Sequence, residues 1–175
     1  MKAIRNLLPM LLMGCATSPP PGVEPVTGFD LDRYLGTWYE IARLDHRFER
    51  GLTDVTATYS RNDDGAIRVV NRGWNPESSK WETAVGKAKF RGEPTEASLR
   101  VSFFGPIYGG YFVFALDREN YAHALVAGPT INYLWILARE PKLDEEVYKE
   151  YVARAAARQF PTDELIRVEH GVAPE

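Results

Sequence analysis

The side chains of this sequence that could do chemistry are few, and their spacing does not suit catalysis. The one cysteine, Cys15, lies near the start of the chain, and the three histidines, His46, His123 and His170, are far apart. Neither a Cys/His metal spacing nor a Gly-x-Ser-x-Gly elbow or phosphate-binding loop is present. The sequence therefore predicts a binding protein rather than an enzyme, without a metal ion or cofactor.

Cys15 ends a short segment with the features of an export signal. A positively charged start precedes an apolar stretch far shorter than the ~20 residues of a membrane-spanning helix. The sequence LMGC at residues 12–15 resembles the lipobox of bacterial lipoproteins. The resemblance implies that residues 1–14 are a signal peptide, that Cys15 becomes acylated and anchors the chain, and that Ala16 directs sorting to the outer membrane. A fortuitous cysteine in an ordinary signal peptide is the alternative.

The next segment predicts a tether ahead of one folded domain. Residues 17–25 read TSPPPGVEP, which is too rich in proline for a core element, so 15–27 is expected to be the acylated cysteine and a stiff extended arm. The remaining residues, 28–175, suit a single domain. With a net charge of −3 and no Lys/Arg block, nucleic acid is not an expected partner.

The domain reads as strands followed by one helix. Eight short runs with period-two alternation are separated by turn residues such as Asp64-Gly65, which is typical of an antiparallel all-β fold. After Pro141, the stretch from Asp144 to Arg158 has an apolar stripe at helical spacing, and residues 165–168 would form a last short strand. The eight runs lie near residues 37–44, 53–61, 66–74, 80–90, 97–103, 110–117, 121–127 and 133–139.

Three short motifs carry a resemblance to a known family. Residues 29–43 read FDLDRYLGTWYEIAR, which resembles the first lipocalin motif, with Gly36 and Trp38 forming Gly-x-Trp on the first strand. Residues 117–121 occupy the place of the second motif but depart from its usual Thr-Asp-Tyr, and Arg139 matches the arginine of the third. The resemblance implies an eight-stranded up-and-down antiparallel barrel with one C-terminal α-helix packed outside.

Two longer stretches, residues 45–51 and 101–111, resemble the bacterial outer-membrane lipocalins in particular. That resemblance implies binding of lysophospholipids or fatty acids for membrane maintenance, a lipid-anchored domain facing the periplasm, and a homodimer. The residues themselves support only one small apolar ligand at a membrane. A haem or bilin ligand would need an axial histidine or a thiol in the cavity, and the sequence offers no strong candidate.

Barrel topology predicts how the motif residues are placed. In an up-and-down barrel of eight strands, the start of the first strand and the end of the eighth are neighbours. Trp38 and Arg139 should therefore meet as a structural cation–π pair at the closed end. Trp135 precedes Arg139 by four residues, hence ~13 Å along the same strand and on the same face. An interior position in contact with ligand is predicted for Trp135; packing under the helix is the alternative.

The loops after strands one, three, five and seven should surround the open mouth. Phe104, Ile107 and Tyr108 fall in one of them and predict either a ligand gate or an association surface. By resemblance, Tyr108 is expected to touch ligand with Trp135. Arg47 is the preferred headgroup contact in a charged loop that could equally be solvated. The mouth loops are residues 45–52, 75–79, 104–109 and 128–132.

Two other classes of function stay open at this level. A barrel filled by its own side chains would instead act through its loops on an envelope protein, and a lipocalin-fold enzyme is a further alternative. Truncation of Trp135 or Tyr108 should weaken a lipid carrier, whereas a filled interaction protein should tolerate it.

Overall fold

The computed structural model describes residues 17–173, so the signal-peptide and Cys15 predictions lie outside the described residues. The helices are α1 (Leu31–Tyr34), α2 (Glu145–Ala156) and the 3₁₀ turn η1 (Thr162–Glu164). The strands are β1 (Gly36–Arg43), β2 (Thr53–Arg61), β3 (Ile67–Asn75), β4 (Lys80–Phe90), β5 (Ser98–Phe104), β6 (Ile107–Leu116), β7 (His123–Ala127), β8 (Leu134–Ala138) and β9 (Ile166–Arg167).

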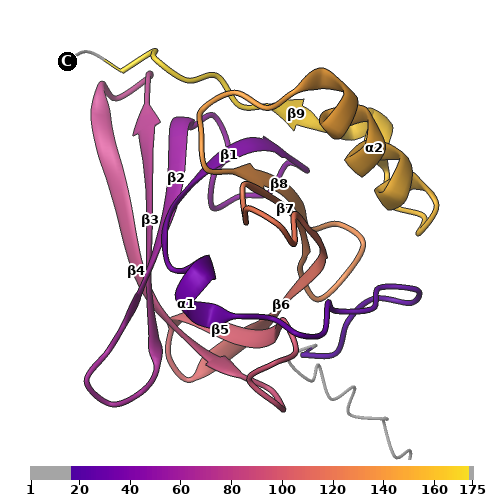
Figure 1. The fold of residues 1–175 in the computed structure, drawn as a ribbon. Helices are drawn as coiled ribbons and strands as arrows, with labels where there is room; N and C mark the ends of the chain where they lie inside the picture. The colour runs from indigo at the N-terminus through magenta and orange to yellow at the C-terminus, as the bar shows by residue number, and fades with distance from the viewer. Residues whose placement is uncertain (1–16, 174–175) are drawn as a thin grey trace, which may run out of the picture.

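The first eight strands close into an antiparallel barrel. Each strand pairs with the next along the chain, and β1 pairs with both β8 and β2, which leaves no open sheet edge between them. Figure 1 shows the strands as a ring with α2 outside it. The predicted all-β, eight-stranded up-and-down barrel with a C-terminal helix outside is confirmed, as is the short last strand, since β9 pairs with β1.

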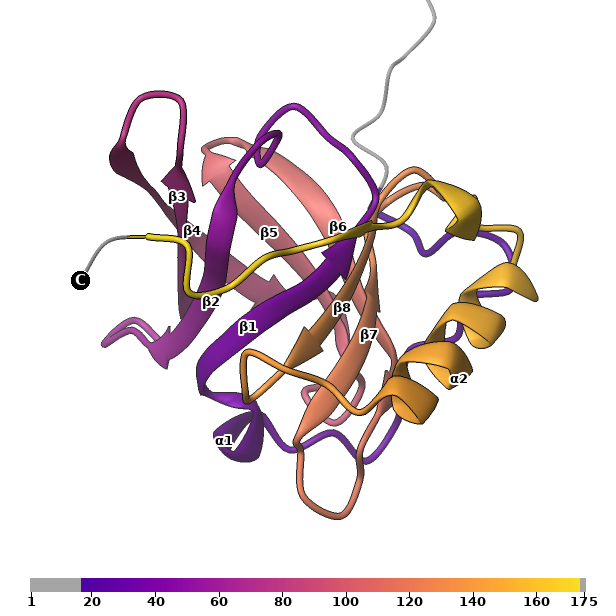
Figure 2. The same ribbon diagram turned by 90° about the horizontal axis from the view of Figure 1, so that it is seen from above.

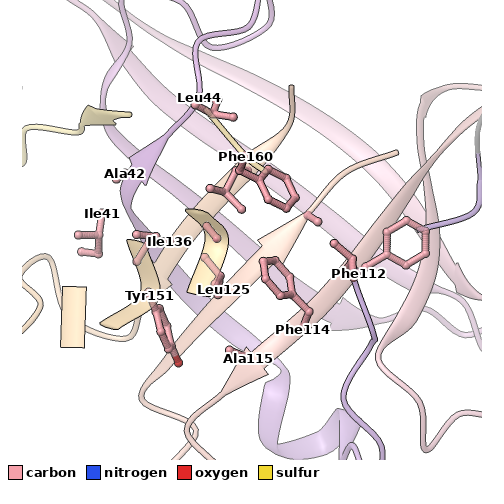
Figure 3. Close-up of a cluster of buried hydrophobic side chains, with 14 of the residues drawn as sticks. Ile41, Ala42, Leu44, Phe112, Phe114, Ala115, Leu125, Ile136, Tyr151 and Phe160 are labelled. Carbon is pink, nitrogen blue, oxygen red and sulfur yellow. The ribbon is translucent and has the colours of Figure 1, made fainter. Parts of the chain in front are cut away.

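Two apolar clusters lie on opposite faces of the barrel wall. The outer cluster joins α2 to the strands beneath it, and Tyr151 and Ala155 of the helix belong to it. Figure 3 shows Tyr151 beside Leu125 and Ile136 of the strands. Phe160, just after the helix, stacks on Phe114 with ring centroids 5.8 Å apart. The inner cluster lies inside the barrel and includes Phe29, Tyr34, Trp38, Tyr59, Ile67, Val69, Ala88, Leu99, Val113, Val126 and Leu137.

The segment predicted to be a tether lies instead along the barrel. Val23 is buried in the outer cluster, and the backbone N–H of Val26 donates to the carbonyl of Val113. Arg158, just past α2, also donates to the carbonyl of Gly22. The prolines keep the segment extended, but its two valines bury apolar surface, so residues 22–27 do not form a free arm.

The C-terminal segment forms a strap across the outside of β1 and β2 (Figure 2). The carboxylate of Asp54 accepts backbone N–H groups from Gly171, Val172 and Ala173. Asp54 itself has a φ of +51° at a register shift in β2, a backbone conformation uncommon for a residue with a side chain. This conformation turns the carboxylate toward the strap.

Candidate functional site

Trp38 and Arg139 close one end of the barrel. The Arg139 guanidinium carbon lies 3.9 Å from the centroid of the fully buried Trp38 ring. Gly36 has a φ of +97°, and a Cβ atom there would lie 3.3 Å from Nη1 of Arg139, so glycine gives the guanidinium its room. The Arg139 nitrogens also donate to the carbonyls of Arg33, Tyr34, Leu35, Thr37 and Tyr121. These contacts are structural.

Three tyrosine hydroxyls meet inside the barrel. The hydroxyls of Tyr34 and Tyr111 are 2.7 Å apart, and Tyr59 donates to Tyr111 at 2.9 Å. Burial raises the pKa of all three phenols, so they stay neutral. The rest of the inner cluster is predominantly apolar, which suits an apolar guest.

A buried ionic network lies toward the open mouth. Nη1 of Arg43 donates to the Glu40 carboxylate at 2.8 Å, and Nη2 donates to the carbonyls of Glu49 and Leu52. Arg43 and Glu40 are 2% and 4% exposed, so both are out of bulk water. Burial, together with the nearby Glu49, raises the pKa of Glu40 well above its usual range.

Trp135 joins this network from β8. Its indole N–H donates to Oε2 of Glu49 at 3.1 Å, and the same oxygen lies 2.9 Å from Nε2 of His46, an ion-pair distance without hydrogen-bond alignment. Burial opposes ionisation of Glu49, but His46 and Trp135 outweigh it and lower the pKa of Glu49. The Trp135 ring also packs edge-on to His46 and stacks on Tyr133.

Some polar atoms of the barrel interior lack a protein partner. Within the described chain, Nε of Arg43, Nδ1 of His46 and Oδ1 of Asn71 are buried without a hydrogen bond. A buried donor or acceptor left unpaired costs about 1–3 kcal/mol. The mouth side of the interior therefore offers hydrogen-bonding capacity that the protein does not use itself.

The structure separates the residues predicted from sequence to touch ligand. Trp135 belongs to the interior group rather than packing under α2. Tyr108 lies on the outer face, where the guanidinium carbon of Arg100 is 5.3 Å from its ring centroid. Alternation along β6 explains this position, because Val113 faces inward and Tyr108 has the opposite parity. Phe104 is exposed at the mouth.

Arg47 is also exposed, with its guanidinium 4.8 Å from the Phe48 ring centroid. Its loop is the one in which His46 and Glu49 turn inward. Sequence reasoning missed Glu40 and Arg43 altogether. A signal existed for Glu40, because it has the parity of the inward-facing Trp38, whereas the register shift between Glu40 and Ala42 hid the inward direction of Arg43.

Two hollows lie on the outside of the barrel. One of about 450 Å³ is lined by Tyr39, Arg72, Trp81 and the C-terminal strap, and another of about 420 Å³ by Lys87, Ser102 and Tyr108. Among residues 17–173, no cluster of three metal-ligating side chains occurs. No helix in that range has the length and apolar character needed to span a bilayer.

Comparison with known proteins agrees with this geometry. Residues 29–170 match the model of the Lipocalin-like domain, and the chain belongs to the lipocalin family. It is 56% identical over 160 residues to the Outer membrane lipoprotein Blc of Escherichia coli K12, covering 91% of this chain and 90% of that protein.

A second relative is the Outer membrane lipoprotein Blc of Vibrio cholerae, at 47% identity over 97% of this chain and 99% of that protein. Among solved structures, insecticyanin from the tobacco hornworm Manduca sexta is similar in fold, with a TM-score of 0.69. That likeness covers 88% of this chain and 87% of the insecticyanin chain at 20% identity, and it speaks to the fold alone.

Proposed function

We propose that this barrel holds one single-chain amphiphilic lipid, a fatty acid or a lysophospholipid, for storage or transport in membrane maintenance. The acyl chain would lie in the inner cluster and the headgroup beside the buried network at the mouth. The supporting observation is the unpartnered buried N–H at Nε of Arg43, beside a second unpartnered buried nitrogen, Nδ1 of His46.

The two ends of such a lipid suit the two parts of the interior. Methylene groups gain about 0.8 kcal/mol each when apolar side chains such as Leu99 and Val126 replace water around them. A carboxylate or phosphate oxygen would accept a hydrogen bond from Nε of Arg43, which would offset the cost of burying that group. Trp135 would contact the first methylenes below the headgroup.

We infer that the protein is anchored in the outer membrane. Relatives at 47% and 56% identity are named outer membrane lipoproteins, which supports acylation of Cys15 and anchoring of this chain in the outer membrane, with the barrel in the periplasm. A lipid anchor would confine the barrel to the neighbourhood of one leaflet and keep the effective concentration of its ligand high.

Native mass spectrometry of residues 17–175 tests lipid binding, because the described part of this stretch contains the whole barrel and both apolar clusters. The protein would be delipidated and then exposed to lysophospholipids and fatty acids. One lipid per chain should rebind, and Trp135→Ala should weaken binding about tenfold, since loss of an aromatic contact removes about 1.4 kcal/mol or more.

Trp81→Ala is the matched control, because Trp81 is the partly exposed tryptophan of the outer face. It should bind lipid as the wild type does. If neither the wild type nor the control retains or rebinds any lipid, the carrier function is refuted. A filled barrel that acts through its loops on another envelope protein would then be favoured.

A further inference from the structure

Two of the four connections at the mouth differ in charge from those at the closed end. The β5–β6 and β7–β8 connections, residues 105–106 and 128–133, contain no charged residue, whereas the β1–β2 loop and the β3–β4 turn do. Each closed-end connection between β2 and α2 contains at least two charged residues. These connections are residues 62–66, 91–97, 117–122 and 139–144. A protein end that faces bulk water on all sides has no need of such a contrast.

Large apolar side chains are exposed at the same mouth. Phe104 and Ile107 are 69% and 65% exposed on the β5–β6 hairpin, and Phe48 is 54% exposed on the β1–β2 loop. Ile131 adds a fourth from the β7–β8 loop. We call these four residues the mouth patch. Apolar groups gathered from three separate loops at one end indicate a surface that binds something apolar.

Arginine side chains lie beside the mouth patch, as they do in protein segments that bind at a membrane interface. The Arg47 guanidinium lies over Phe48, and the side chain of Arg50 pairs with Asp45 at 2.8 Å beside it. The remaining acidic group of that loop, Glu49, is turned into the barrel. Arg47 is therefore placed beside an exposed aromatic ring, a combination that suits the headgroup level of a bilayer.

The chain enters the structure at this end. The carbonyl oxygen of Thr17 lies 3.5 Å from the position of a Cβ built on Gly110, near the mouth end of β6. From there the N-terminal segment runs along the barrel to the closed end. The backbone N–H of Phe29 donates a hydrogen bond there to the carbonyl of Thr95 in the β4–β5 loop. Figure 2 shows the described chain starting at the end that carries the β1–β2 loop, opposite α1. Cys15 precedes Thr17 by two residues, a reach of about 7 Å at full extension.

We propose that the mouth patch binds the surface of the bilayer that holds the acylated Cys15, so that the barrel stands with its open end on the membrane. The inference rests on the proposed acylation of Cys15, but not on the identity of the ligand. A lipid would then pass between leaflet and barrel without crossing bulk water. The mouth patch is the part that enters the headgroup region, and the charged closed end faces water.

The test uses the full acylated chain in vesicles of phosphatidylethanolamine and phosphatidylglycerol. Acylation converts the Cys15 sulfur to a thioether, so a cysteine introduced by Phe104→Cys is the one free thiol and can carry a polarity-sensitive dye. Glu119→Cys, exposed at the closed end, is the matched control. The dye at 104 should shift its emission to the blue and lose most of it to nitroxide-labelled lipids, whereas the dye at 119 should do neither.

A further variant, Phe104→Ser with Ile107→Ser, separates the mouth patch from the anchor. This variant should stay bound to vesicles through Cys15 and still take up one lipid per chain. A dye attached through Ile131→Cys should be quenched less by nitroxide-labelled lipids in this variant than in the protein that has Ile131→Cys as its only substitution. If the quenching at residue 131 falls as expected but neither this variant nor the wild type takes up lipid, the proposed ligand is wrong and the orientation stands. Unchanged quenching at residue 131 would contradict the role of the mouth patch.

Equal quenching at residues 104 and 119, or none at either, would overturn the proposal. It would also be overturned if the dye at 104 were shielded from aqueous iodide in lipid-free detergent solution while the particle mass doubles. The mouth patch would then be an interface between two copies of the chain.

Discussion

At the scale of single residues, the ionisable groups buried inside the barrel are its least expected feature. Glu40, Arg43 and Glu49 place two carboxyl groups and one guanidinium in a region shielded from water. Buried ion pairs are weak sources of stability, because desolvation offsets much of their attraction. Their retention near the mouth, with Nε of Arg43 left unpartnered, is more readily explained by recognition of a polar group than by stability.

The raised pKa of Glu40 leads to a prediction about pH. Burial and the neighbouring Glu49 hold this pKa above its usual 4.5, so the folded protein retains a proton that the unfolded chain releases. The contribution of Glu40 to stability is therefore fully present below about pH 4.5 and falls as the pH rises toward the raised pKa. Glu40→Gln removes that fall.

The free energy of unfolding of Glu40→Gln, relative to wild type, should thus increase from pH 5 to pH 8 in urea titrations. Glu77→Gln, in the exposed β3–β4 turn, serves as the control and should show a constant difference. A constant difference for Glu40→Gln as well would mean that Glu40 is ionised throughout this range.

Arg139 leads to a second prediction at this scale. Its fork donates to several carbonyls at the closed end while lying over Trp38, and lysine cannot reproduce that geometry. Arg139→Lys should lower the free energy of unfolding by about 2 kcal/mol. Arg68→Lys, an exposed substitution on β3, should change it by less than about 0.5 kcal/mol. Equal effects would show that Arg139 contributes only its charge.

At the scale of elements, α2 stabilises the barrel from outside. Phe160 is buried where the chain leaves the helix and stacks on Phe114 of β6 (Figure 3). Phe160→Ala should cost about 3 kcal/mol of unfolding free energy, since it leaves a cavity between helix and sheet. Phe48→Ala removes an exposed ring and should cost less than about 0.5 kcal/mol. A small loss for Phe160→Ala would mean that α2 is dispensable for the barrel.

The C-terminal strap responds to pH through Asp54. Partial burial disfavours its carboxylate, but three backbone N–H groups of the strap outweigh this and lower the pKa of Asp54. A depressed pKa gives stability that is present above the unfolded value and is lost as the pH falls through the folded one. Hydrogen exchange at Gly171 and Val172, corrected for intrinsic rates, should therefore speed up below about pH 4.

Asp54→Asn should already show fast exchange of the strap at pH 7, with little further change on acidification. Asp64→Asn, at the closed end, should leave the strap protected at pH 7. Protection that persists in Asp54→Asn would mean that pairing of β9 with β1 holds the strap without this carboxylate.

Sequence periodicity predicted the elements well and the site less well. Each of the eight barrel strands matched a run of alternating residues, and that alternation also placed Trp38 inside. The β1–β2 loop has no such period. The sequence therefore could not predict that His46 and Glu49 turn inward while Arg47 stays outside. Tyr108, expected at the ligand by resemblance, lies outside because strand parity decides its direction.

At the scale of the whole molecule, polarity changes along the barrel axis. Trp38 and Arg139 close one end, the apolar inner cluster follows, and the buried network around Arg43 lies toward the mouth. Outside the mouth come two uncharged connections and the exposed rings of Phe48 and Phe104. This order matches an amphiphile taken up tail first from a bilayer below the mouth.

The most direct measurement of this arrangement is a crystal structure of the protein with a fatty acid that has bromine near its methyl end. We expect an anomalous bromine peak inside the barrel, among Leu99, Val113 and Leu137, with the carboxylate near Arg43. A bromine peak confined to the outer hollows, or a barrel interior filled by its own side chains at saturating ligand, would contradict it.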